Sequence, residues 1–136
     1  MSIAKHFVVP LENKPGELAH LASILSGVSV NIQAISIPET PHGKAGKIRL
    51  LVDDEARAKK ALVSANIPFE EEEVIVLYLE NKPGALAGLA DKLSREKIEL
   101  EYAYAVSHKG SATTPVIVKA IPRSENTTST PAKTDS

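Results

Sequence analysis

Leu11-Glu-Asn-Lys-Pro-Gly16 decides the fold, because the same six residues return at Leu79–Gly84. The two copies lie 68 residues apart, and 12 of the 16 positions in 11–26 are identical in 79–94. This spacing exceeds the roughly 20–50 residues of solenoid repeats, so each copy is predicted to be a small domain rather than one layer of a stack. The chain is therefore predicted to hold two related domains in tandem.

The first copy has the pattern of a β-α-β-β-α-β unit. An apolar run from His6 to Leu11 indicates a strand, and the Asn-Lys-Pro-Gly that follows is typical of a turn that begins a helix. Helical spacing then runs to about Ser26, before Gly27. Strands at 30–38 and 46–52, a helix at 54–64 and an extended segment after Pro68 complete the unit. This order predicts an α+β fold of the ferredoxin-like type, a four-stranded antiparallel sheet with both helices on one face.

The second copy repeats this order only in part. Strands are predicted at 74–79, 98–106 and 114–120, with a helix at 86–93. Residues 121–136, which align with the second helix of the first copy, are polar and show no periodicity. We therefore predict a first domain over 1–72, a second over 73–121 that is truncated after its third strand, and a disordered polar tail over 122–136.

The truncation has a consequence for assembly. A sheet that lacks a covering helix exposes apolar surface of roughly a few hundred Å², an amount that usually marks an interaction site. We predict a homodimer that buries this surface. The alternative is that the first domain covers it within one chain.

Composition excludes several classes of function. The 16 basic and 17 acidic residues nearly cancel, so no nucleic-acid partner is expected. The chain has no cysteine and its four histidines lack metal-ligand spacing, so neither a metal nor a cofactor is expected. It has no apolar run of about 20 residues and no signal-peptide pattern, which predicts a cytoplasmic protein without a membrane partner.

The repeated motif has the chemistry to bind a zwitterion. Gly16 and Gly84 have no Cβ, so a ligand can approach the helix start, where unpaired N–H groups attract a carboxylate. Asn13 and Asn81 add an amide that both donates and accepts hydrogen bonds. The alternative is purely structural: the same residues make a good turn, with the asparagine capping the first helical turn.

The order of these features resembles the ACT domain. An apolar strand, Asn-x-Pro-Gly, a leucine-rich helix and then Val30-Asn-Ile32 at the next strand carry the resemblance, which covers residues 5 to about 120 in both copies. ACT domains are small regulatory modules that bind amino acids, usually where two such domains pair. The Tyr102-Ala-Tyr104 stretch and the lack of an enzyme domain make the chain similar to free-standing tandem ACT proteins.

The resemblance implies the ligand-binding residues. In the first domain they are Asn13, Lys14, Gly16, Glu17, Leu18, Asn31 and Ile32, and in the second Asn81, Gly84, Ala85, Leu86 and Glu99. Asn31 would hydrogen-bond the amino or carboxyl group of the effector, whereas its counterpart Glu99 is an acid, so the two sites cannot be chemically equal. Serine-binding members look as though they use a histidine two residues before the motif asparagine. Leu11 and Leu79 stand there, so an apolar amino acid is at least as well supported as serine.

We therefore predict a non-catalytic, allosteric regulatory protein that senses a free amino acid at ACT–ACT interfaces and acts on an enzyme or a transcription factor. A ligand-free dimerisation scaffold is the alternative from a different class. A third, weaker alternative is an acylphosphatase-like hydrolase that would use Arg49 with Asn13, on fold analogy alone. No catalytic residue is predicted.

Two further features allow more than one interpretation. Glu70–Glu73 is predicted to be a solvated strand edge that resists unwanted pairing. A cation site is disfavoured there because alternate strand residues point to opposite faces. Tyr102 and Tyr104 are predicted to lie in the core or an interface, with stacking on the ligand as the alternative.

Overall fold

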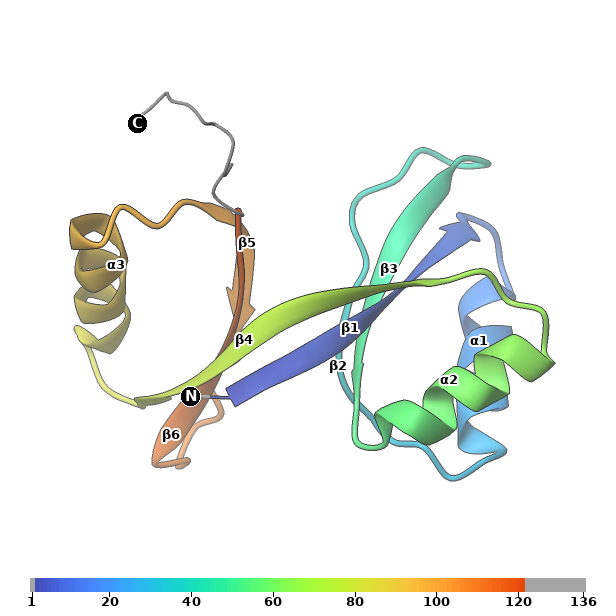
Figure 1. Ribbon diagram of the computed structural model, residues 1–136, viewed down its shortest axis with the longest axis horizontal. Helices are drawn as coiled ribbons and strands as arrows, with labels where there is room; N and C mark the ends of the chain where they lie inside the picture. The colour runs from blue at the N-terminus through green and yellow to red at the C-terminus, as the bar shows by residue number, and fades with distance from the viewer. Residues whose placement is uncertain (1, 122–136) are drawn as a thin grey trace. The chain divides into compact units, whose positions relative to one another are not determined.

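The computed structural model describes residues 2–121, so the tail predicted over 122–136 lies outside the described residues. The elements are β1 (Ser2–Glu12), α1 (Glu17–Ser26), β2 (Ile32–Ser36), β3 (Ala45–Val52), α2 (Glu55–Ser64), β4 (Glu70–Glu80), α3 (Ala85–Arg95), β5 (Leu100–Ala105) and β6 (Thr113–Ala120) (Figure 1). Contacts divide the chain into two compact units, Ile3–Glu73 and a second unit from Val74 onward that also takes Ser2. None of the helices in residues 2–121 has the length and apolar character needed to cross a membrane.

The first unit has the predicted ferredoxin-like α+β fold. Its strands lie in the order β2-β3-β1-β4, with the start of β4 in the last position. β1 and β3 are antiparallel, with Phe7 opposite Leu50 and Val9 opposite Ile48, and β2 runs antiparallel to β3. α1 and α2 pack against each other beside these strands (Figure 1).

The core of the first unit is almost entirely aliphatic. Alternate residues of β1 and β3 meet the inner faces of α1 and α2, as period-2 and period-3.6 patterns require. The rings of Phe7 and Phe69 meet edge to face, with centroids 5.5 Å apart. The buried members of this core are Phe7, Val9, Leu21, Leu25, Val30, Ile48, Leu50, Val52, Ala58 and Leu62.

The second unit repeats the first with the same spacing. Its strands lie in the order β4-β6-β5, and β4, α3, β5 and β6 each begin 68 residues after β1, α1, β2 and β3. The described part of this unit has no counterpart of α2. Whereas α1 buries Leu21 and Leu25, α3 buries no residue.

One strand takes the place of two predicted segments. The extended segment after Pro68 and the strand at 74–79 are a single strand, β4, because nothing from Phe69 to Glu80 carries a glycine or proline that would end it. The division between the units after Glu73 falls inside this strand. The predicted domains, 1–72 and 73–121, stay a prediction.

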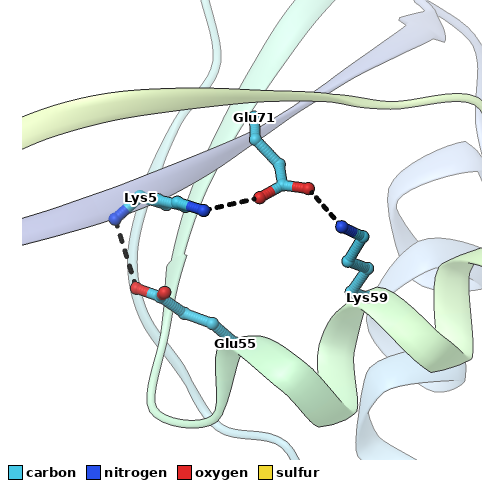
Figure 2. Close-up of polar contacts among 4 residues, drawn as sticks. All are labelled: Lys5, Glu55, Lys59 and Glu71. Carbon is cyan, nitrogen blue, oxygen red and sulfur yellow. Dashed lines mark hydrogen bonds and ion pairs between the residues drawn. The ribbon is translucent and has the colours of Figure 1, made fainter.

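The prediction that Glu70–Glu73 forms a solvated edge is wrong. β4 lies next to β1, and two of the four carboxylates pair with cations of the first unit. Glu71 meets Lys59 at 2.9 Å and Lys5 at 3.2 Å, while the backbone N–H of Lys5 donates to Glu55 (Figure 2). Glu72 accepts from Nε of Arg49 at 3.1 Å. Strong local charge in the sequence could not reveal these partners, which come from β1, β3 and α2.

Glu71 should make stability depend on pH. The hydrogen bond from Lys59, with a further one from Lys5, holds the pKa of the Glu71 carboxyl below its ordinary value of 4.5. A depressed folded-state pKa contributes stability that is present above 4.5 and is lost as pH falls through the lowered value. We expect Glu71→Gln to lower the melting temperature at neutral pH and to flatten the decline below 4.5. Thermal melts across this range test it, with the exposed Glu70→Gln as control; an unchanged acid decline in Glu71→Gln would contradict the assignment.

Candidate functional site

The repeated motif forms a tight turn between β1 and α1. The N–H of Asn13 donates to the carbonyl of Lys44 at 2.8 Å, and the N–H of Lys14 donates to that of Glu12 at 3.0 Å. Gly16 has φ of +91°, and a Cβ added there would meet no atom within 4 Å. The backbone conformation, not crowding, therefore requires glycine. Gly84 does the same in the second unit, with φ of +90°.

Substitution of these glycines should cost backbone energy only. We expect Gly16→Ala and Gly84→Ala each to lower the free energy of unfolding by about 1 kcal/mol, because an L residue is strained at positive φ. Gly88, inside α3 with open space around it, is the matched control. Gly88→Ala should raise stability by up to about 1 kcal/mol through helix propensity. Chemical denaturation measures all three, and a gain in Gly16→Ala would contradict the assigned strain.

The motif asparagines do not cap the helices. α1 and α3 begin after Gly16 and Gly84, without a side-chain cap, so the predicted capping role of Asn13 and Asn81 is wrong. Nδ2 of Asn13 instead donates to the carbonyl of Thr40 at 2.7 Å. Each asparagine therefore ties the turn to the loop between the two following strands, 37–44 in the first unit and 106–112 in the second.

The two asparagine amides differ in what they leave available. In the second unit, Nδ2 of Asn81 donates to the carbonyls of His108 at 3.1 Å and Ser111 at 2.9 Å, and its Oδ1 accepts from the Ser107 hydroxyl at 2.8 Å. Ser107 corresponds to Glu39, whose carboxylate cannot donate when ionised. Oδ1 of Asn13 has no partner within residues 2–121. Only the first unit thus presents a free amide oxygen.

The first turn of α1 presents free donors. The N–H of Glu17 makes only a long contact, 3.5 Å, with the Lys14 carbonyl, and the helical ladder begins with the N–H of His20 on Gly16 at 3.0 Å. Between them, the N–H groups of Leu18 and Ala19 have no partner in the part of the chain that the structure describes. Such orphan donors at the positive end of the helix favour an anion.

Asn31 and Ile32 lie beyond the other end of α1. Asp53 fixes the Asn31 backbone, because its Oδ1 accepts from the Asn31 N–H at 2.9 Å and its own N–H donates to the Asn31 carbonyl at 3.1 Å. A ten-residue helix, about 15 Å long, separates Asn31 from Asn13, so one unit does not bring them together. An open hollow of about 340 Å³ lies at this end, lined by Ala22, Ser26, Ser29, Val30, Asn31 and Ile32.

The predicted residues of the second unit have the same arrangement. Gly84, Ala85 and Leu86 lie at the start of α3, whereas the exposed Glu99 follows its far end. The carbonyl of Glu99 accepts from the N–H of Ile121 at 2.8 Å, repeating the backbone bond between Asn31 and Asp53. Sequence reasoning missed the loop residues that contact the asparagines. The exchange of Glu39 for Ser107 at the repeat spacing was the available signal.

Arg49 and Asn13 do not form a hydrolytic pair. Arg49 binds Glu72 and stands opposite Val8 in the sheet. Asn13 meets Lys44, five residues earlier on β3 and therefore roughly 16 Å away. The geometry gives the acylphosphatase-like alternative no support. Within residues 2–121, no group of three or more histidine and acidic side chains is placed to hold a metal ion.

Comparison with known proteins agrees with the order of elements. Residues 7–66 match the AHAS small subunit-like ACT domain. Protein BT0572 from Bacteroides thetaiotaomicron is 30% identical to this chain, with a TM-score of 0.79 over 87% of this chain and 79% of that one. No curated protein matches the chain.

Two regulatory subunits of aspartate kinase share the fold at lower identity. The ligand-free form from Thermus thermophilus is 15% identical, with a TM-score of 0.63 over 88% of this chain and 84% of that one. The subunit from Thermus flavus is 16% identical, with a TM-score of 0.60 over the same shares. The matched domain, the repeat and the shared fold lead to one conclusion: the chain belongs to the ACT-domain family.

Proposed function

We propose that this chain is a non-catalytic regulatory protein that binds one free amino acid at the start of α1. The carboxylate accepts hydrogen bonds from the N–H groups of Leu18 and Ala19, and the ammonium group donates to Oδ1 of Asn13. Glu17, in the first turn of α1, offers a second acceptor for the ammonium group. The observation that carries this assignment is the presence, in one turn, of two unpartnered donors and an unpartnered amide oxygen.

The likeness to two regulatory subunits of aspartate kinase, one described as ligand-free, supports a regulatory role that involves a ligand. We infer that the bound amino acid changes how this protein associates with itself or with the enzyme or transcription factor that it regulates. The protein would act in the cytoplasm as a homodimer.

Asn31 and Ile32 enter the same site only from a second copy of the chain. The hollow beside them is lined by apolar side chains, among them Ala22, Val30 and Ile32, together with the hydroxyls of Ser26 and Ser29. Its volume of about 340 Å³ falls at the lower end of the range for ligand sites. Such a lining suits an apolar amino-acid side chain better than that of serine.

The scaffold alternative fits the second unit. Asn81 has partners for its amide oxygen and for both amide hydrogens, and Glu99 replaces the amide of Asn31 with an acid. We infer that the first unit binds the ligand and that the second is a structural partner. One ligand per chain follows from this division.

A thermal-shift screen with the twenty amino acids, each at millimolar concentration, tests the proposed function. A ligand at 100 times its dissociation constant stabilises the folded state by about 2.7 kcal/mol, which corresponds to a rise of several degrees for a chain of this size. We expect the largest rise with an apolar amino acid. No shift with any of the twenty, together with no heat of binding, would leave only the scaffold.

A further inference from the structure

The helix side of the second unit is incompletely covered. In the first unit, α2 packs against α1 and adds Ala58, Ala61 and Leu62 to the buried residues. No counterpart of α2 occurs in residues 74–121, and positions that are buried in the first unit become half-buried 68 residues later. The pairs are Phe7 and Ile75, Val9 and Leu77, Leu21 and Leu89, and Leu25 and Leu93.

α3 carries the most exposed part of this face. Leu86, Ala90 and Leu93 follow the i, i+4, i+7 spacing of one helix face. They correspond to Leu18, Ala22 and Leu25 of α1, the helix that packs against α2. Leu86 is 62% exposed, against 40% for Leu18. We call Leu86, Ala90 and Leu93 the α3 stripe.

The chain after Ile121 does not offer suitable side chains to cover this stripe. Residues 122–136 contain no leucine, isoleucine, valine or aromatic residue, and only Ala132 and two prolines are apolar. In the first unit the covering surface is a helix whose buried residues are alanine and leucine. The α3 stripe of a second copy has this same chemistry.

We propose that the α3 stripe packs against the α3 stripe of a second copy. An antiparallel contact centred on Ala90 places the small residue of each helix at the crossing point, where it allows close approach, and puts Leu86 of one copy beside Leu93 of the other. The same patch serves both partners, as a two-fold interface requires. This inference assigns a surface to the predicted homodimer and does not depend on the amino-acid site.

Sedimentation of the full chain and of Leu86→Glu tests the contact. We expect a dimer that weakens at least tenfold in Leu86→Glu, because the new carboxylate would lie in the apolar contact. Since Leu86 is already exposed in the single chain, the variant should fold, which circular dichroism checks. The matched control is Leu18→Glu in α1, which should remain dimeric. A monomeric parent chain at about 100 µM, or an unchanged dimer in Leu86→Glu, would overturn the proposal.

Crosslinking gives an independent measurement, because the chain has no cysteine of its own. Ala90→Cys should form a disulfide-linked dimer under mild oxidation, since the two Ala90 positions face each other. Gly88→Cys, on the opposite side of α3, should not. Equal crosslinking of the two variants, or none in either, would overturn the antiparallel contact. Loss of amino-acid binding with an intact dimer would refute only the proposed function.

Discussion

Leu25→Ala is expected to lower the free energy of unfolding by about 3 kcal/mol, the middle of the range for truncating a buried leucine. Leu25 is 1% exposed and belongs to the core cluster of the first unit, which includes Leu21, Leu50 and Leu62. The rigid sheet beneath α1 cannot close fully around the missing atoms, so a cavity remains. Urea denaturation followed by circular dichroism measures the loss.

The repeat supplies a matched control for this core variant. Leu93 occupies the same position of α3 but is only half-buried. We expect Leu93→Ala to cost roughly 1 kcal/mol in the single chain, because part of the side chain already contacts water. The remainder should appear as weaker self-association through the α3 stripe. Equal losses of unfolding free energy in the two variants would contradict the difference in packing between the units.

Asn13→Ala is expected to weaken amino-acid binding by roughly 10- to 100-fold, as the loss of a hydrogen bond to a charged group implies. The variant removes the free Oδ1 that accepts from the ammonium group, and it also releases the Thr40 carbonyl, so the 37–44 loop should loosen. Asn31→Ala should weaken binding by about 1–3 kcal/mol if a second copy contributes that amide. Calorimetric titration of both variants measures these effects.

Asn81→Ala is the control for the binding variant. Its amide is occupied by Ser107, His108 and Ser111, so the substitution should destabilise the 106–112 loop and leave amino-acid affinity within about twofold. A loss of affinity as large as that of Asn13→Ala would show that both units bind ligand. The inferred division between a binding unit and a structural unit would then be wrong.

The sequence was sufficient to predict the fold, because its signals are local. The repeated turn, the helical spacing of Leu18, Leu21 and Leu25, and glycine at the turn positions each determine a short segment. Repetition at 68 residues then predicts the second unit. The single strand β4 was missed because a strand that ends one unit and begins the next carries no mark where the units divide.

The candidate site could be predicted only in part, because its partners come from distant segments. The glycine at the helix start follows from the motif, but the carbonyl that binds Asn13 belongs to Thr40, in a loop without a recognisable pattern. The cation partners of Glu71 are likewise set by strand order and helix placement. Identical motifs therefore gave two turns with different free atoms, and the difference depends on Glu39 and Ser107.

The most direct measurement is a calorimetric titration of the full chain with the amino acid that gives the largest thermal shift, repeated with its carboxamide. We expect one binding event per chain and loss of binding by the carboxamide, because the N–H groups of Leu18 and Ala19 need an anionic acceptor. Two equivalent events per chain, or equal affinity for the carboxamide, would contradict a single carboxylate site at the start of α1.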